Sequence, residues 1–201
     1  MSVPNCIILD RDGTLIDVVR HTETGVISVA FHPSQLRLLP GVVQGLTRFR
    51  DAGFDLAIAT NQPGPAKGQF SKEAAQRTNA ALQALLKEQG FEVASFQVCW
   101  HHPEGGPGGD SSLVGACACR KPQPGMLHSI LTELNTTPDR AWMVGDSPSD
   151  VQAAQAAGVH SAMVAPWNRC ELCPLREGPN VRPDLMGTSL DAIAKEIVAR
   201  G

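Results

Sequence analysis

The sequence has no tyrosine, and aromatic residues make up only 4% of its 201 residues. This scarcity disfavours a surface on which nucleic-acid bases stack. The formal net charge is only −3, so any anion must be bound by local groups rather than by a general positive field. No apolar run approaches the roughly 20 residues of a membrane-spanning helix, and the N-terminus lacks the basic segment and cleavage site of a signal peptide. We therefore expect a cytoplasmic protein without nucleic-acid or membrane partners.

The length and the cysteine content set further bounds. A chain of 201 residues is long enough for one domain with a sizeable core, and we expect residues 1–201 to form a single domain and a monomer. In the cytoplasm, the six cysteines are expected to be thiols or metal ligands rather than disulfides. Cys6 is predicted to lie in the core. Cys170 and Cys173 have no second pair to complete a metal site and are interpreted as free thiols.

Strand-like and helix-like segments alternate along the chain. Short apolar runs predict strands, helical spacing with capping residues predicts helices, and Gly/Pro-rich segments predict loops. The predicted strands are 6–9, 54–60, 94–100, 141–145 and 160–164, the predicted helices 42–52, 71–89, 124–134, 149–157 and 189–199, and the loops 103–116 and 165–187. This alternation predicts an α/β fold, a doubly wound parallel sheet with helices on both faces. In such sheets, ligands bind beyond the carboxyl ends of the strands.

The first predicted strand ends in the sequence DRDGTLI, which begins at Asp10. Asp10 and Asp12 are two residues apart, so their side chains would share a face in extended chain. Two close carboxylates repel each other and call for a cation, and Mg²⁺ suits oxygen ligands. One carboxylate could then attack phosphorus while the other transfers protons. A solvated turn or a calcium loop has the same D-x-D-G sequence, so this motif alone leaves those alternatives open.

Polar residues follow the later strands as well. Thr60 and Asn61 could hold phosphoryl oxygens, although a turn or a helix cap has similar composition. Lys121 could neutralise a phosphoryl group that is being transferred, and Arg120 could grip a second anionic group of the substrate. The alternative for these two residues is a solvated basic pair.

The fourth motif is MVGDSPSD, at the end of the predicted strand 141–145. Asp146 follows a strand and a glycine, so it is the better candidate for a metal ligand. Asp150 falls in the first turn of the next predicted helix, where an acid also interacts favourably with the helix dipole. We therefore expect Asp150 to support the site indirectly or to be structural only.

Taken in order, these four motifs resemble those of the haloacid dehalogenase superfamily of phosphatases, and the resemblance covers nearly the whole chain. It implies a Rossmann-like fold without a separate cap domain. It also implies that Asp10 is the nucleophile and Asp12 the general acid/base. Thr60 and Lys121 would stabilise the phosphoryl group, and Asp10, the Asp12 carbonyl and Asp146 would hold Mg²⁺.

A second metal site is indicated by Cys99-x-His101 and Cys117-x-Cys119. Three thiols and one imidazole form the closed tetrahedral set that structural Zn²⁺ prefers. Such a site would pin the Gly/Pro-rich loop between the pairs and fix the chain just before the phosphate-binding lysine. His102 is a competing ligand, and the alternative is a set of buried cysteines beside a surface histidine.

The run CWHHP…CACRKPQPGML is more specific. It resembles the zinc loop of the D-glycero-D-manno-heptose 1,7-bisphosphate phosphatase and histidinol-phosphate phosphatase subgroup. The long segment between His101 and Cys117 favours the heptose enzymes. The resemblance implies Mg²⁺ and Zn²⁺ as cofactors, a role for Arg120 in substrate recognition, and removal of the 7-phosphate in the synthesis of lipopolysaccharide and surface glycans.

The sequence departs from this subgroup at two places. Segment 17–32 is longer, and we expect it to form a flap in which Arg20 and His21 bind substrate. Ser147 replaces a basic residue of the subgroup. Lys67 could substitute for that residue, and the alternative is that Lys67 is an ordinary solvated lysine in a loop. The alternative functions are hydrolysis of histidinol phosphate, hydrolysis of a nucleic-acid 3′-phosphate, and a non-catalytic zinc protein on a phosphatase fold. The retained acids and lysine disfavour the last.

Overall fold

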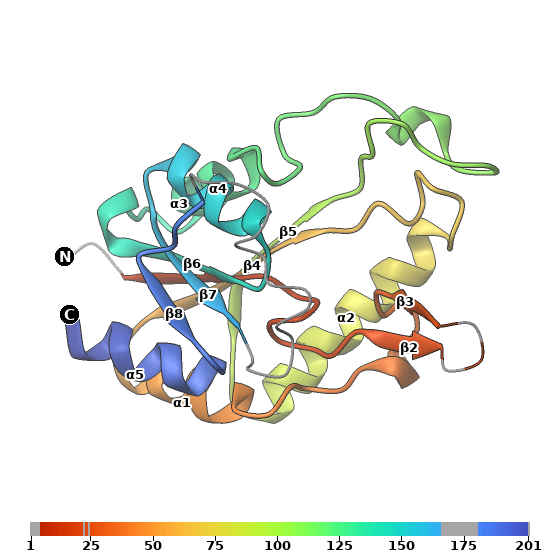
Figure 1. The fold of residues 1–201 in the computed structure, drawn as a ribbon. Coiled ribbons are helices and arrows are strands. Elements are labelled where there is room, and N and C mark those ends of the chain that lie inside the picture. The colour runs from red at the N-terminus through yellow and green to blue at the C-terminus, as the bar shows by residue number, and fades with distance from the viewer. Residues whose placement is uncertain (1–4, 22, 24, 166–180, 201) are drawn as a thin grey trace.

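The computed structural model describes residues 5–21, 23, 25–165 and 181–200, and its centre is a six-stranded parallel sheet (Figure 1). The strand order is β5-β4-β1-β6-β7-β8, and every neighbouring pair runs parallel. The strands are β1 (Cys6–Leu9), β4 (Asp55–Asn61), β5 (Val93–Cys99), β6 (Ala141–Gly145), β7 (His160–Val164) and β8 (Leu185–Gly187). The chain extends the sheet from β1 in one direction and then, from β6, in the other. The carboxyl end of β1 is thus the switch point where such sheets bind ligands.

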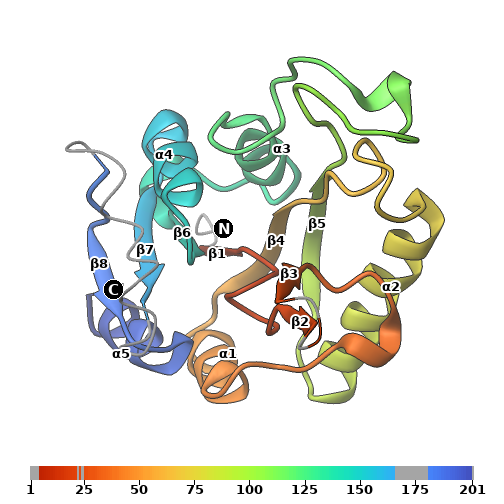
Figure 2. The same ribbon diagram turned by 45° about the vertical axis from the view of Figure 1, so that its right-hand side comes forward.

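Helices cover both faces of the sheet, as expected for a doubly wound fold (Figure 2). One face is covered by α1 (Val42–Asp51), α2 (Lys72–Glu88) and α5 (Leu190–Arg200), and the other by α3 (Gly125–Glu133) and α4 (Pro148–Ala157). Successive residues of β1 face opposite sides, so Ile7 packs into the first layer and Ile8 into the second. Both layers are fully apolar around β1, which explains its uninterrupted hydrophobic sequence.

Two segments predicted to lack regular structure contain short strands. The segment predicted to be irregular after residue 165 contains β8, which pairs with β7 through Met186 and Met163. The flap predicted after the first strand contains an antiparallel hairpin of β2 (Val19–His21) and β3 (Val26–Ser28). These strands have three residues each and are partly exposed, so they carry no apolar run that a sequence pattern could detect.

Three short 3₁₀ helices complete the described elements: η1 (Pro33–Gln35), η2 (Ser111–Leu113) and η3 (Pro138–Arg140). Cys6 is buried, as predicted, whereas Cys170 and Cys173 lie outside the described residues. Within the part of the chain that the structure describes, no helix has the length and apolar character needed to cross a bilayer.

Candidate active site

The ends of β1 and β6 and the first turn of α4 bring three of the predicted acids together. Asp10 follows β1 directly, and its backbone N–H donates to the Val144 carbonyl of β6 at 2.9 Å. Asp146 follows β6, and Asp150 lies in the first turn of α4. Carboxylate oxygens of Asp10, Asp146 and Asp150 all lie within 4.8 Å of one another. Asp10 of the first motif and both acids of the fourth motif therefore form one cluster at the switch point of the sheet.

Two glycines allow these carboxylates to come so close. Gly13 has a φ of +82°, and a Cβ at that position would lie 2.0 Å from Oδ2 of Asp146. A Cβ on Gly145 would lie 2.2 Å from Oδ2 of Asp150. Any larger residue would push an acid out of the cluster, so D-x-D-G and G-D are spatial requirements as well as chemical ones.

Lys121 reaches the cluster from the segment that precedes α3. Its Nζ lies 2.7 Å from Oδ1 of Asp10 and 2.6 Å from Oδ1 of Asp150, and it donates to the carbonyl oxygen of Ala59 at 2.7 Å. The side chain of Lys121 is only 2% exposed. Desolvation opposes the charge of such a lysine, but the neighbouring carboxylates outweigh it and raise the pKa of Lys121 above its ordinary value. Lys121 is therefore a fixed positive charge beside Asp10.

The cluster carries more negative than positive charge. Burial, together with the charges of Asp150, Asp146 and Asp12, raises the pKa of Asp10 to about 8 even though Lys121 acts in the opposite direction. Lys121 pairs with two of the three carboxylates, Asp10 and Asp150, and a further cation would relieve the repulsion that remains in the cluster. The donors are all hard oxygens, and the chemistry of this set fits Mg²⁺.

Asp150 belongs to the cluster and also connects it to α4. It is 1% exposed, and its Oδ2 accepts hydrogen bonds from the backbone N–H of Ser147 at 3.1 Å and from the Ser147 hydroxyl at 2.8 Å. Its other oxygen pairs with Lys121. Asp150 thus joins the N-terminus of α4 to the lysine, which agrees with a supporting role. Ser147, one of the two departures from the heptose subgroup, caps this helix.

Asp12 lies outside the carboxylate cluster and faces β4 instead. Its Oδ2 accepts a hydrogen bond from Nε2 of Gln62 at 2.7 Å, and the same amide nitrogen donates to the Thr60 hydroxyl oxygen at 2.8 Å. Gln62 therefore links the predicted general acid/base to the predicted phosphate-binding threonine. Because Gln62 is fully buried, this link is shielded from water.

Asn61 makes a contact that the sequence did not suggest. Its Nδ2 donates to the backbone carbonyl of Lys121 at 3.0 Å, and its Oδ1 accepts from the backbone N–H of Lys121 at 3.1 Å. Both ends of the amide are thus used to hold the lysine backbone against the end of β4. Arg120 donates to the carbonyl of His101 at 3.2 Å and is half-buried. That Asn61 and Arg120 bind substrate stays a prediction.

The predicted zinc ligands come together as a compact group of Cys99, His101, Cys117 and Cys119. The Sγ atoms of Cys99 and Cys117 are 3.7 Å apart, and Sγ of Cys119 lies 3.4 Å from Nδ1 of His101. Ligands about 2.3 Å from a central ion, as in zinc–thiolate sites, would be separated by about 3.8 Å in a tetrahedron. Burial raises the pKa of Cys99, so a thiolate there needs a nearby positive charge. The donor set therefore fits a closed structural metal site.

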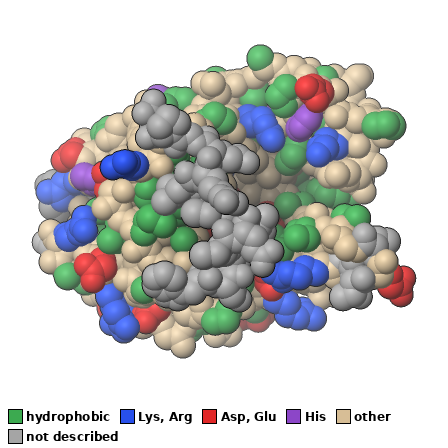
Figure 3. Space-filling view, in the orientation of Figure 1, with side chains coloured by type: hydrophobic (Ala, Val, Ile, Leu, Met, Phe, Trp, Pro, Cys, Tyr) green, Lys and Arg blue, Asp and Glu red, His purple; other side chains and the backbone are tan. Residues whose placement is uncertain are grey.

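His102, the competing ligand, is used elsewhere. Its Nδ1 accepts hydrogen bonds from the backbone N–H groups of Glu104 and Gly105, at 3.2 and 3.0 Å. Burial lowers the pKa of His102, and the positive charges of Arg120 and Lys67 lower it further. Arg120, Lys67 and His102 are here called the basic edge; Glu104 acts on the His102 imidazole in the opposite direction. They lie beside the Cys/His loop, residues 102–116 between the two Cys/His pairs, and Figure 3 shows basic, His and acidic side chains close together on one lobe.

The Cys/His loop packs closely on the loop that follows β4. The backbone N–H of Asp110 donates to the Pro65 carbonyl at 3.0 Å. A Cβ on Gly109 would lie 2.0 Å from the carbonyl oxygen of Ala66, and one on Gly106 would lie 2.6 Å from that of Lys67. The glycines of the Cys/His loop thus let the two backbones touch, and this contact fixes the segment that carries Lys67.

Comparisons with known proteins agree with this geometry. Residues 118–192 match the family model described as HAD-hydrolase-like. The D-glycero-beta-D-manno-heptose-1,7-bisphosphate 7-phosphatase of Pseudomonas putida is 35% identical over 79% of this chain and 81% of its own length. The protein of the same name from Yersinia pestis is 31% identical over 99% and 97%.

The chain belongs to the haloacid dehalogenase-like phosphatases. The crystal structure of a D,D-heptose 1,7-bisphosphate phosphatase from B. bronchiseptica, complexed with magnesium and phosphate, superimposes with a TM-score of 0.78. It is 28% identical and covers 98% of this chain and 99% of its own. A six-stranded parallel sheet with helices on both faces, as found here, is thus the haloacid dehalogenase-like fold expected from the four motifs.

In this haloacid dehalogenase-like phosphatase, the flap residues are placed only in part. Arg20 is exposed at the start of the hairpin and pairs with Asp17 at 2.9 Å. The side chain of His21 lies outside the described residues. Stacked rings of Phe31 and Phe70, with centroids 5.1 Å apart, connect the chain after the hairpin to the loop after β4. That Arg20 and His21 bind substrate stays a prediction.

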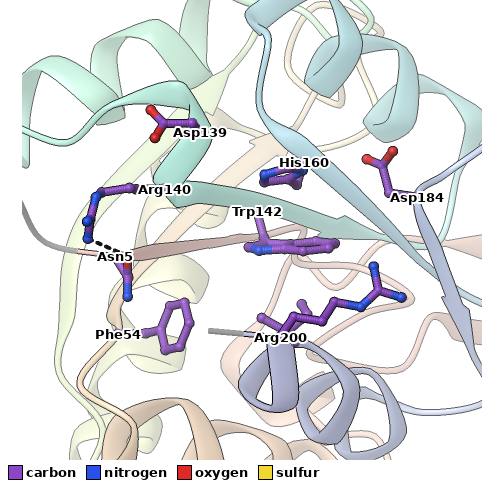
Figure 4. A pocket seen from close by; sticks show the side chains of 9 residues that line it. Asn5, Phe54, Asp139, Arg140, Trp142, His160, Asp184 and Arg200 are labelled. Carbon is purple, nitrogen blue, oxygen red and sulfur yellow. Dashed lines mark hydrogen bonds between the residues drawn. The ribbon is translucent and has the colours of Figure 1, made fainter.

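A hollow of about 540 Å³ lies at the opposite, amino-terminal end of the strands of this phosphatase (Figure 4). His160 stacks on Trp142 at 4.8 Å, and Arg140 donates to Asn5 at 3.2 Å. Of the described residues, none that was predicted for the site lines the hollow. Its lining consists of Asn5, Phe54, Asp139, Arg140, Trp142, His160, Asp184, Ile197 and Arg200. The phosphatase chemistry therefore belongs to the other end of the sheet.

Sequence reasoning missed the three residues of the hydrogen-bond network that holds Asp12. Gln62, Arg11 and Asn79 are buried and connected to one another by hydrogen bonds. Of the three, Asn79 could have been found from the sequence. It is a polar residue between the apolar Ala75 and Leu82 on the core face of α2, and such a residue needs a buried partner.

Proposed function

We propose that this chain removes the 7-phosphate from D-glycero-β-D-manno-heptose 1,7-bisphosphate. The observation that carries the proposal is the contact between Lys121 and Asp10 inside a cluster of buried acids at the switch point of the sheet. A carboxylate held against an ammonium group at this place is suited to attack a phosphate monoester. The names of the relatives, at 31–35% identity, support the heptose substrate and the β anomer.

The chain's own residues account for the steps of the reaction. A carboxylate oxygen of Asp10 attacks phosphorus, and the bond to the sugar oxygen breaks as an aspartyl phosphate forms. Asp12 protonates the departing sugar oxygen and then takes a proton from the water that hydrolyses the aspartyl phosphate. Lys121 and the hydroxyl of Thr60 lie beside this path and stabilise the phosphoryl oxygens.

Two metal ions complete the proposal. The side chains of Asp10 and Asp146 and the backbone carbonyl of Asp12 would hold Mg²⁺, which supplies positive charge to the phosphoryl oxygens when bound. The Cys/His group would hold a structural Zn²⁺. It lies directly before Arg120 and Lys121 in the chain, so its role would be to fix the position of both basic residues.

The second phosphate of the substrate needs its own positive partner. Lys67 and Arg120 are the two cations of the basic edge, and both act electrostatically on His102. We propose that this edge binds the 1-phosphate, with Arg120 as a bidentate donor. Asn61 would contribute through Lys121, and Arg20 and His21 of the flap would contact the sugar.

The remaining features of the proposal concern the protein as a whole. They are a single domain over residues 1–201, a monomer, a cytoplasmic location, and no nucleic-acid or membrane partner. The net charge of −3 supports the expectation about nucleic acid. Light scattering and a binding titration with an oligonucleotide would test two of these features directly.

The deciding experiment measures phosphate release in the presence of Mg²⁺. The substrates are the α and β anomers of heptose 1,7-bisphosphate, histidinol phosphate, and a 3′-phosphorylated oligonucleotide. We expect the β anomer to have the highest kcat/KM. Preference for the α anomer would correct the anomer only. Preference for histidinol phosphate or the oligonucleotide would refute the substrate and keep the chemistry, whereas no phosphate release from any of them would refute the proposal.

A further inference from the structure

Arg11, between the two acids of the first motif, is completely buried, with 0% of its surface exposed. Charged residues are almost never fully buried unless they are paired. Its neighbours Asp10 and Asp12 have proposed roles in the reaction, but nothing so far gives Arg11 one. A buried guanidinium next to the nucleophile is costly to desolvate, so its contacts indicate what it does.

The guanidinium grips Asp12 with two hydrogen bonds. Nε of Arg11 donates to Oδ2 of Asp12 at 2.9 Å, and Nη2 donates to Oδ1 at 3.0 Å. Such a two-point contact fixes the plane of a carboxylate as well as its position. Gln62 adds a third donor to Oδ2 of the same carboxylate. The orientation of Asp12 is therefore set from outside the acid cluster.

Arg11 is itself held by three other segments of the chain. Its Nη1 donates to Oδ1 of Asn79 on α2, and its Nη2 donates to the Ala30 carbonyl at 2.8 Å and to Oε1 of Gln62 at 3.0 Å. Ala30 follows the hairpin, and Gln62 follows β4. The guanidinium thus connects the chain after the hairpin, α2 and the end of β4. These three contacts together fix the orientation in which the guanidinium meets Asp12.

We infer that Arg11 is a positioning residue for the general acid/base Asp12, and that Asn79 acts through Arg11. The inference rests on the proposed function, because it assumes that Asp12 protonates the leaving group. Proton transfer by a positioned side chain contributes roughly 10²–10⁴-fold to a rate, and a misplacement of about 1 Å can remove a factor of about 10². The buried network supplies the fixed orientation that this step requires.

Leaving-group dependence distinguishes positioning from a merely structural role. Phenyl phosphate and p-nitrophenyl phosphate are similar in shape, but p-nitrophenol is the stronger acid and departs without needing a proton. Loss of general-acid catalysis therefore slows phenyl phosphate more than p-nitrophenyl phosphate. The quantity measured is the kcat/KM ratio of the nitrophenyl ester to the phenyl ester, because kcat/KM includes the departure of the leaving group.

Two variants and one control make the test. Asn79→Ala removes an acceptor of Arg11 and touches neither substrate nor Asp12, and we expect it to raise the ratio by about fivefold or more. Arg11→Lys keeps the charge and loses the two-point grip, and we expect a rise of about tenfold or more. Thr78→Val is the control, because this buried α2 hydroxyl donates to the Ala74 carbonyl of its own helix and, among the described residues, has no hydrogen bond to Arg11 or Asp12. It should leave the ratio unchanged.

The outcomes separate the inference from the proposed function. If Asn79→Ala lowers both rates equally, or changes neither, the positioning role is refuted, and this holds even where Arg11→Lys fails to fold. A similar rise of the ratio in Thr78→Val would also refute it, because the effect would then follow from any damage to α2. If the wild-type chain hydrolyses the aryl esters but not heptose bisphosphate, the proposed substrate is wrong, and the inference is still decided by the ratio.

Discussion

Replacing Lys121 by methionine removes the positive charge between two buried acids. The side chain of Lys121 is 2% exposed, and its Nζ lies within 2.7 Å of both Asp10 and Asp150. Methionine is about as long but apolar, so Lys121→Met leaves the space filled and the two carboxylates facing each other without a counter-charge. This substitution therefore isolates the electrostatic contribution of the lysine.

The magnitude follows from the burial of the pair. Removing one partner of a buried ion pair costs about 3–5 kcal/mol of stability, because the remaining charge stays desolvated. Asp150→Asn alone should cost less, since Lys121 keeps Asp10 as its partner. In the double variant, the loss should be smaller than the sum of the single losses by about 1–3 kcal/mol. That difference is the interaction free energy between Lys121 and Asp150.

Urea unfolding gives the free energy of unfolding of the wild type and the three variants. The buffer should contain no added Mg²⁺, because a bound divalent cation would replace part of the missing charge, and no chelator, so that any zinc stays bound. Losses that add within about 0.5 kcal/mol would show that the two residues are energetically independent. A wild-type unfolding midpoint for Lys121→Met would refute the reasoning altogether.

Three further changes test other parts of the site. Asp10→Asn should abolish turnover and leave the circular dichroism spectrum unchanged; near-wild-type phosphate release would exclude Asp10 as the nucleophile. Cys117→Ser should lose zinc, measured by mass spectrometry of the metal content, and should melt at a lower temperature; wild-type protein that is folded without metal would contradict a structural zinc. Gly109→Ala should raise KM several-fold, because the added Cβ would press on Ala66 and displace Lys67. The zinc content should be unchanged. An unchanged KM would argue against a role for this loop contact.

The sheet and the acid cluster could be predicted because their signals are local in sequence. A short apolar run that ends on an acid indicates both a buried strand and a polar group at its carboxyl end, as Leu9-Asp10 and Gly145-Asp146 show. The parallel topology then places such ends together without any knowledge of tertiary contacts. The Cys/His group was predictable for the same reason, since its two pairs flank one loop.

The partners of Lys121 and Asn61 could not be predicted, because sequence shows residue types and not contacts. Its position after a strand predicts that Asn61 binds phosphate. In the structure, however, both its Nδ2 and its Oδ1 hydrogen-bond to the backbone of Lys121, 60 residues later in the chain. The short strand β8 was missed because each of its residues is at least partly exposed. Such features depend on long-range packing, which leaves no periodic signal.

The buried polar network around Asp12 shows how such a signal could still be found. A polar residue on the core face of a helix needs a partner, because an unpaired buried amide costs about 1–3 kcal/mol. Asn79 occupies such a position on α2, and only a buried donor from another element could satisfy it. The one arginine beside the nucleophile is that donor. A polar residue within the apolar stripe of a helix, such as Asn79, can therefore indicate a buried partner. A charged residue inside a strand-end motif, such as Arg11, is a candidate for that partner. The pair then points to the side chain whose orientation it fixes, here Asp12.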